Sequence, residues 1–315
     1  MLRVISLIPS ATEIVDALGL RAWLVGRSHE CDYPPGVERL PVLTEAKIDL
    51  TGTSREIDQR VRTVLAQALS VYRVFSDQLD ALAPDVILTQ AQCEVCAVSL
   101  SDVEDAVRIG INTKPQVVAL EPNRLEDVWR DVARVAEALE MPARGTRLVE
   151  RLQARMAALE NRTRLQRTRP RVVCIEWIDP LMAAGNWIPA LVEMAGGQSL
   201  FGQHGAHTPY VTWEALRAAD PDVIVVMPCG FGLEQTYDEA GVLTGHPGWA
   251  DLQAVRQGRV YLADGNHFFN RPGPRLVTSL EILVEILHPN SFSFGHHGHG
   301  WKRLAQNEPS HTRST

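Results

Sequence analysis

The chain has few cysteines, few aromatic residues and no long apolar run. Five cysteines in 315 residues are too sparse for the disulfide framework of a small secreted protein. No apolar run reaches the roughly 18–20 residues that a transmembrane helix needs. The formal net charge of -7 gives no electrostatic reason to expect nucleic acid or an anionic membrane as a partner. With 45% hydrophobic and 22% charged residues, the composition is that of a globular chain.

The common catalytic motifs are also missing. The chain has no P-loop, no G-x-S-x-G elbow and no H-E-x-x-H, and residues 9–11 read Pro-Ser-Ala where a dinucleotide fingerprint would follow the first strand. We therefore expect no enzymatic activity. One alternative stays open, a chelatase-like tetrapyrrole enzyme. It would need a His and an acidic residue facing the ring metal, and His267 with Asp264 or His29 with Glu30 could supply them.

We expect no secretory signal in the N-terminal residues as written. Residues 1–9 pass from Arg3 into a short apolar strand and then into Pro9. A signal needs a basic stretch, then 7–15 apolar residues and a cleavage site of small residues. As written, the sequence predicts a cytoplasmic protein, and a periplasmic one if the true start lies upstream.

The chain does contain an alternation of buried strands and amphipathic helices. The predicted strands are residues 3–8, 23–26, 84–89, 116–120, 171–177, 221–226 and 258–262. The predicted helices are residues 14–18 (started by a capping-type segment at 10–13), 125–139, 188–195, 211–219 and 276–287. Residues 50–74 read as an inserted amphipathic helix followed by a short strand. This alternation predicts an α/β fold.

A long central helix divides the pattern into two halves. Leu148, Leu152, Met156 and Leu159 recur every three or four residues, which predicts one amphipathic helix over 143–169. The pattern Pro-Asp-Val-Ile at 84–87 recurs at 221–224 as Pro-Asp-Val-Ile, so we expect two similar Rossmann-like lobes. The predicted parts are an N-terminal lobe (1–142), the linking helix (143–169), a C-terminal lobe (170–289) and a loosely packed, polar, His- and Gly-rich tail (290–315).

Several motifs together resemble one family. In order they are SLIPSATE at 6–13, VGRS at 25–28, DYPP at 32–35, PDVI at 84–87 and RPGPR at 271–275. Over residues 6 to about 289 the chain resembles the iron-siderophore/cobalamin class of ABC-transporter substrate-binding proteins, its cobalamin-binding members above all. The resemblance implies the helical-backbone (class III) fold, in which two lobes hold a metal chelate in the cleft between them without catalysis.

The resemblance implies that cobalamin or another corrinoid is the bound ligand, with a siderophore or haem-type chelate left open. Ligands of open α/β sheets bind beyond the carboxyl ends of the strands, where this chain carries aromatic and amide side chains that suit a corrinoid. The predicted ligand-binding residues are Ser10, Ala11, Tyr33, Gln90, Gln92, Trp177, Trp187, His267, Phe268, Phe269 and Arg271. Cobalamin-binding relatives carry tryptophan at the positions aligned with Glu45 and Gln90, so the chain departs from them there.

A group of Cys and His residues follows two of the predicted strands. Cys93 and Cys96 form a C-x-x-C after one strand, and His29 and Cys31 follow another. If the two loops meet, these residues could hold zinc or another transition metal, or contact the metal of a bound complex. A redox pair and simple buried thiols are the other interpretations. The histidines of the tail we expect to bind metal only weakly and incidentally.

Two acidic residues bear on the choice of protein partner. Secreted relatives present one acidic residue on each lobe to arginines of a permease, and Asp77 and Glu214 align with these positions. Both fall early in a helix, where the helix dipole favours a carboxylate. We expect capping to be their role here, in a monomeric corrinoid carrier or buffer inside the cell, with docking to an ABC permease as the alternative. The expected partner is then a small corrinoid or siderophore-type molecule, and no nucleic acid.

Overall fold

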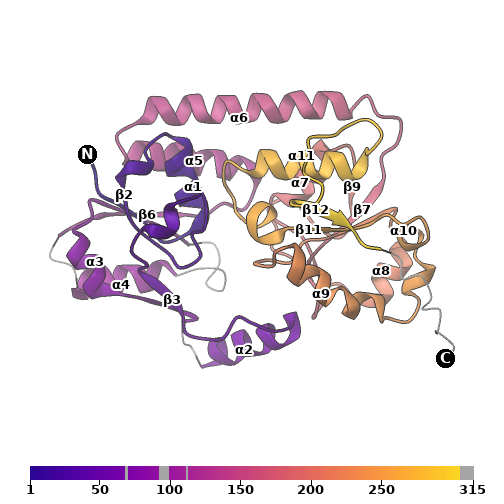
Figure 1. Ribbon diagram of the computed structural model, residues 1–315, viewed down its shortest axis with the longest axis horizontal. Helices are drawn as coiled ribbons and strands as arrows, with labels where there is room; N and C mark the ends of the chain where they lie inside the picture. The colour runs from indigo at the N-terminus through magenta and orange to yellow at the C-terminus, as the bar shows by residue number, and fades with distance from the viewer. Residues whose placement is uncertain (68–69, 92–98, 111–112, 306–315) are drawn as a thin grey trace, which may run out of the picture. The chain divides into compact units, whose positions relative to one another are not determined.

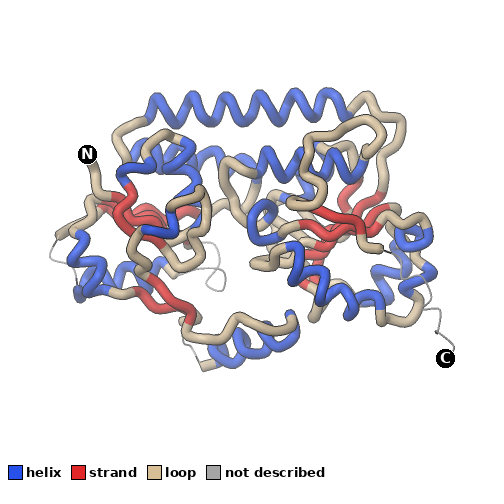
Figure 2. Tube along the Cα trace, viewed as in Figure 1, coloured by secondary structure: helices blue, strands red, loops and turns tan. Residues whose placement is uncertain are grey.

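The computed structural model describes residues 1–67, 70–91, 99–110 and 113–305. The chain forms two compact units: unit 1 holds Met1–Ala158 and Arg271–Val277, and unit 2 holds Leu159–Asn270 and Thr278–Thr315. Each unit builds its own sheet with helices around it (Figures 1 and 2), which confirms the α/β class with two lobes. In the described part of the chain, no helix combines the length and apolar character needed to cross a bilayer.

Unit 1 is built on four parallel strands in the order β2-β1-β5-β6. These are β1 (Val4–Ser6), β2 (Leu24–Arg27), β5 (Val86–Gln90) and β6 (Gln116–Leu120). The inserted segment gives α2 and the second strand of an antiparallel pair, β3 (Thr44–Ala46) and β4 (Tyr72–Val74), as predicted. The helices are α1 (Pro9–Ala17), α2 (Ser54–Ala66), α3 (Ser76–Leu82), α4 (Leu100–Gly110) and α5 (Leu125–Ala138), with short 3-10 turns η1 (Arg21–Trp23) and η2 (Val37–Arg39).

Unit 2 repeats this plan and extends it. Four parallel strands pair in the order β9-β7-β10-β11, and the antiparallel strands β8 and β12 pair with β7 and β11. The strands are β7 (Arg171–Trp177), β8 (Met182–Ala183), β9 (Gln198–Ser199), β10 (Val223–Val226), β11 (Val260–Ala263) and β12 (Trp301–Arg303). The helices are α7 (Ile188–Met194), α8 (Trp213–Ala219), α9 (Leu233–Thr244), α10 (Gln253–Arg256) and α11 (Leu276–Leu287), with a 3-10 turn η3 (Trp249–Asp251) and a π turn η4 (Gly265–Phe269).

The repeated Pro-Asp pattern has the same structure in both units. Ala83 follows the last residue of helix α3 and Asp220 follows that of helix α8, and both are in the left-handed conformation. Proline and aspartate follow each, and the aspartate carboxylate accepts the backbone N–H that opens the neighbouring strand. Asp85 accepts from Arg3 at 2.7 Å, and Asp222 accepts from Arg171 at 2.7 Å. The repeat therefore fixes how the central pair of strands starts in each sheet.

The central helix α6 (Pro142–Thr163) is confirmed, but it ends six residues earlier than predicted. All four periodic residues, Leu148, Leu152, Met156 and Leu159, are buried. The helix ends where the Thr163 hydroxyl donates to the carbonyls of Glu160 and Met194, a contact that periodicity alone does not reveal. Figure 1 shows α6 as one continuous helix.

Two other predictions were wrong. Helix α1 starts at Pro9 and has no side-chain cap, because proline takes the first helical position without losing a needed N–H. Segment 10–13 is thus inside the helix rather than a cap. The start of the tail is not loose either: β12 pairs with β11, and the buried carboxylate of Glu285 accepts from Trp301 Nε1 and from the N–H of Gly295. A buried carboxylate needs such donors, and the tail supplies them.

Candidate functional site

In each unit the parallel strands end at one edge of the sheet, and the predicted ligand residues cluster there. We call residues 9–11, 27–33 and 90 the unit 1 edge, and residues 176–177, 227–231 and 264–270 the unit 2 edge. Ligands of such sheets bind beyond the carboxyl ends of the strands. The two edges differ in chemistry.

The unit 1 edge is dominated by ion pairs around a buried arginine. The guanidinium of Arg271 donates to both carboxylate oxygens of Asp32, at 2.5 and 2.9 Å, and approaches Glu13 at 3.5 Å. Arg271 is 5% exposed. Burial alone would lower the pKa of Arg271, but the carboxylates of Asp32 and Glu13 raise it above its usual value. This arginine, predicted to contact ligand, is held by carboxylates of the protein.

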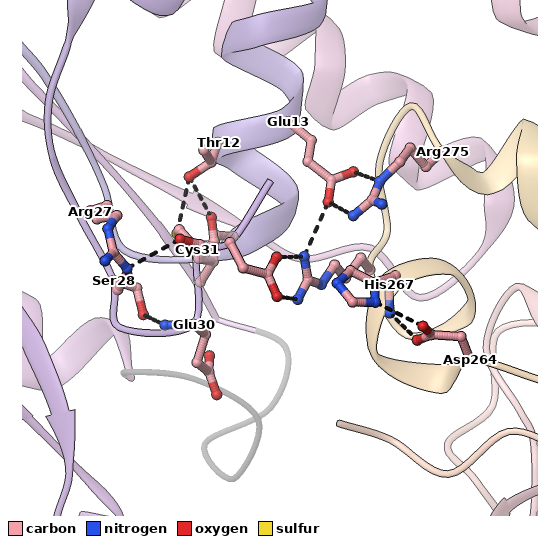
Figure 3. Close-up of polar contacts among 12 residues, drawn as sticks. Thr12, Glu13, Arg27, Ser28, Glu30, Cys31, Asp264, His267 and Arg275 are labelled. Atoms are coloured by element: carbon pink, nitrogen blue, oxygen red, sulfur yellow. Dashed lines mark hydrogen bonds and ion pairs between the residues drawn. The ribbon is translucent and has the colours of Figure 1, made fainter. Parts of the chain in front are cut away.

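A second arginine completes this network. Arg275 donates to both oxygens of Glu13, and the labelled pair is seen in Figure 3. The same guanidinium lies 4.0 Å from the ring centroid of Tyr33, a cation–π contact. Tyr33 is 36% exposed, so one face of its ring is covered by Arg275 while part of the side chain stays accessible.

His29 and Glu30 lie beside this network. The ring nitrogen Nδ1 of His29 contacts the hydroxyl of Thr44 at 2.8 Å, and burial lowers the pKa of the imidazole. Among the described residues, the buried Nε2 of His29 finds no hydrogen-bond partner. Burial raises the pKa of Glu30 to about 7, against the opposing charge of Arg271. Burial therefore favours the neutral form of both side chains.

Cys31 is fully buried. The hydroxyl of Thr12 donates to its sulfur at 3.1 Å, and burial raises the pKa of the thiol to about 12. Cys93, Cys96 and Gln92 lie outside the described residues. Within the described part of the chain, no group of three or more His, Cys, Asp or Glu side chains is placed to hold a metal. The four-residue metal site stays a prediction.

The remaining predicted residues of unit 1 differ in accessibility. Ser10 and Ala11 lie in the first turn of α1 and are 4% and 0% exposed. Gln90 ends β5 and is partly exposed. Ser10 and Ala11 therefore support the edge from within, and Gln90 is the more accessible of the three.

The unit 2 edge carries aromatic side chains. Trp177 ends β7, and its ring packs on Phe231, which follows β10, with the ring centroids 5.4 Å apart. The indole Nε1 of Trp177 is buried, and no acceptor for it lies within reach among the described residues. A buried N–H without a partner costs about 1–3 kcal/mol. The edge therefore offers an aromatic surface and a donor for which the protein supplies no acceptor.

A histidine–carboxylate pair stands at the end of β11. Asp264 accepts the backbone N–H of His267 at 2.7 Å, and its other oxygen faces ring nitrogen Nδ1 at 2.8 Å (Figure 3). The Asp264 side chain is 10% exposed and that of His267 is 40% exposed. Phe268 lies next to it, with the rings 6.4 Å apart.

Two further predicted ligand residues of unit 2 are buried. Phe269 is fully buried, and Trp187 is 5% exposed. The indole N–H of Trp187 donates to the carbonyl of Phe269 at 2.9 Å. This hydrogen bond and the burial of both side chains hold the turn after β11 in place.

The two predicted docking acids are both exposed, and each stands in the first turn of its helix. Asp77 lies in α3 and Glu214 in α8. Helix α8 also has a side-chain cap, because the Thr212 hydroxyl accepts the N–H of Ala215, whereas α3 has none. The placement agrees with a capping role, and docking stays a prediction.

A surface basin of about 640 Å³ opens elsewhere on unit 1, between α1 and α6, and none of the predicted ligand residues lines it. Arg144 is part of its wall and donates to the carbonyls of Leu18 and Gly19. Arg144 therefore satisfies two carbonyls just after the end of α1, and we assign no chelate to the basin.

Sequence reasoning missed Phe231 and the Glu13–Arg275 pair. Phe231 follows the carboxyl end of β10, so the rule that identified the other edge residues would have found it too. Glu13 and Arg275 are separated by 262 positions, and no local pattern marks such a pair.

Comparison with known proteins identifies the family to which this arrangement belongs. A family model described as periplasmic binding protein matches residues 4–266. A vitamin B12-binding protein of Photorhabdus laumondii is 23% identical over 299 residues, which cover 92% of this chain and 89% of that protein. The uncharacterized ABC transporter substrate-binding lipoprotein YvrC of Bacillus subtilis is 22% identical over 295 residues, covering 92% of this chain and 81% of that protein.

A solved structure with the same fold is the periplasmic heme-binding protein RhuT from Roseiflexus sp. RS-1 in its apo form. The TM-score is 0.67 at 24% identity, covering 91% of this chain and 98% of that chain. The two-lobed α/β architecture is thus that of the class III periplasmic binding proteins.

Proposed function

Because the chain belongs to the periplasmic binding protein family, we propose that it reversibly binds a macrocyclic metal chelate, most specifically cobalamin or another corrinoid, for an ABC importer. The chain is a substrate-binding protein and not an enzyme, which sets aside the chelatase alternative.

The observation that carries the ligand class is the unit 2 edge. A corrinoid is a broad apolar ring with amide groups around its rim. Trp177 and Phe231 offer aromatic faces for such a ring. The buried Nε1 of Trp177 lacks an acceptor among the described residues, and an amide carbonyl of the ligand would supply one.

The choice of a corrinoid within this class rests on the relatives. The Photorhabdus laumondii protein that aligns along 92% of this chain is named a vitamin B12-binding protein. RhuT has the same fold and is named a heme-binding protein, so haem is the second candidate for the ligand. The name of the Bacillus subtilis relative supports an ABC transporter as the partner.

Parallel titrations of the purified chain with hydroxocobalamin, haemin and a ferric siderophore test the proposal. We expect hydroxocobalamin to quench tryptophan fluorescence saturably at one ligand per chain, with the tightest apparent Kd of the three. Tighter binding of haemin would replace the corrinoid by haem within the same class. No saturable response to any of the three would contradict the proposal.

A further inference from the structure

Three exposed arginines lie along one flank of helix α6. Arg144, Arg147 and Arg151 are spaced by three and four residues. At about 100° per residue they fall within about 60° of arc around the helix axis, beside the buried side that carries Leu148 and Leu152. The sequence of α6 therefore places three positive charges on one strip of the helix surface.

The same three arginines line the surface basin of about 640 Å³ between α1 and α6. Ala17, Leu18 and Leu148 add apolar atoms to the lining, and Glu150 adds one negative charge. All lining residues belong to unit 1. The basin is thus an open, net positive depression with an apolar component.

The protein leaves this positive charge uncompensated. Arg144 donates to the carbonyls of Leu18 and Gly19, which are neutral acceptors, so its charge remains. Among the described residues, Arg147 and Arg151 have no carboxylate within ion-pair distance. The basin therefore has positive charge available for an external anion.

Other exposed arginines of unit 1 are paired. Arg108 contacts Asp105 at 2.7 Å, and Arg130 contacts Asp127, although their side chains are 74% and 73% exposed. The formal net charge of -7 describes the whole chain and hides the local positive charge at the basin. Charges more than about 8 Å away are largely screened at physiological ionic strength, so the local charge decides which partner can approach.

An anionic lipid surface fits this basin better than a soluble anion does. A single exposed ion pair contributes little, so three exposed arginines would hold one soluble anion weakly. A bilayer presents many phosphates at once, and basic side chains near such a surface act together. The apolar lining suits the glycerol and first acyl carbons beside a headgroup phosphate. Single-stranded nucleic acid would instead use aromatic rings for stacking, and the described lining contains none.

We propose that Arg144, Arg147 and Arg151 form a docking surface for an anionic phospholipid bilayer. One headgroup phosphate occupies the basin, and neighbouring headgroups lie along α6. This inference goes beyond the proposed function, because none of these residues belongs to the unit 1 or unit 2 edge.

Cosedimentation with vesicles of phosphatidylcholine and phosphatidylglycerol tests the proposal, with vesicles of phosphatidylcholine alone as the reference. We expect binding to the anionic vesicles only. The double variant Arg147→Gln, Arg151→Gln should bind at least tenfold more weakly, because each arginine near an anionic surface contributes about fivefold. Glu150→Gln should bind more tightly, since it removes the negative charge of the lining. Raising the salt from about 0.15 M to about 1 M should release the wild-type chain.

The matched control is the double variant Arg108→Gln, Arg130→Gln, which removes the same net charge from exposed arginines that lie elsewhere on unit 1. It should bind the anionic vesicles like the wild type. Equal losses in the two double variants, or no binding of the wild type, would overturn the proposal. Displacement by soluble glycerol phosphate or by a DNA oligonucleotide, at the phosphate concentration of the vesicles, would also overturn it, in favour of a soluble anion or a nucleic acid. Chelate titration of the same variants should match the wild type, so failure of the docking surface and failure of the proposed function are distinguishable.

Discussion

The two edges follow one repeated plan and differ in chemistry: charged side chains dominate the unit 1 edge, and aromatic side chains dominate the unit 2 edge. In both units a left-handed residue, a proline and an aspartate set the start of the central strands. At the unit 1 edge the charges pair with one another, as Arg271 does with Asp32 and Glu13. At the unit 2 edge Trp177 has a buried donor without an acceptor among the described residues.

This difference between the edges distinguishes residues that stabilise the fold from residues that could contact a ligand. Removing one partner of a buried ion pair leaves the other charge uncompensated, so Arg271 and Glu13 are read as residues that hold the fold together. An unsatisfied donor beside aromatic rings is a cost in the free protein that a ligand can remove.

Arg271→Met should have the largest effect on stability. The substitution leaves Asp32 without its bidentate partner and removes one of the two arginines that contact the nearly fully buried Glu13, and breaking such a pair costs about 3–5 kcal/mol. Urea unfolding measures the change. Arg130→Met is the matched control, because the Arg130 side chain is 73% exposed and its pair with Asp127 is worth about 0–1 kcal/mol. Equal losses in the two variants would show that the unit 1 network is not structural.

Glu30 should make stability depend on pH. Its pKa is about 7 in the folded protein against an ordinary value of 4.5, so the folded chain holds a proton that the unfolded chain loses first. The free energy of unfolding should therefore fall as the pH rises from about 4.5 through 7, by up to about 3 kcal/mol. Glu30→Gln removes this contribution, so its stability relative to wild type should be higher at pH 8 than at pH 5. A difference that does not vary with pH would contradict the assignment.

Trp177→Phe should separate ligand binding from stability. The substitution removes the N–H and keeps an aromatic ring, so we expect ligand binding weaker by about 1 kcal/mol and unfolding unchanged or slightly more costly. Trp213→Phe is the opposite case, because its Nε1 donates to the carbonyl of Pro247 at 2.9 Å. That variant should lose stability and keep its affinity. The reverse pattern would mean that Trp177 is a packing residue alone.

Asp77→Asn and Glu214→Gln should have the smallest effects, about 0.3–1 kcal/mol each, because each removes one charge from the first turn of a helix. The loss should be larger at Asp77, since α3 lacks the side-chain cap that Thr212 gives to α8. Thermal unfolding of the two variants measures this order. Unchanged stability in both would remove the capping role and favour docking to a permease.

Much of the fold could be predicted from local pattern. The strands Gln116–Leu120 and Arg171–Trp177 and the helix Leu276–Leu287 were predicted with their observed bounds, because continuous apolar runs and helical periodicity mark them. The packed tail could not be predicted in this way. Glu285 is 4% exposed on α11, and its donors come from a Gly- and His-rich segment that locally resembles a loose one.

The candidate site could be predicted only in part. Trp177 and His267 follow from the rule that ligands bind at strand ends, and the structure places both there. The role of Arg271 could not be foreseen, because Glu13 and Asp32 are 258 and 239 positions away from it in the chain. Only the three-dimensional structure, which shows these long-range ion pairs, distinguishes Arg271 as a structural residue from the candidate ligand residues.

Hydrogen–deuterium exchange with and without hydroxocobalamin tests the central claim most directly, because it reports where the ligand acts on the backbone. The account predicts slower exchange at residues 227–231 and 264–270, the loops of the unit 2 edge, and unchanged exchange at the basin beside Arg144 and Arg147. Saturating ligand that leaves both loops unprotected, or that protects the basin instead, would contradict it.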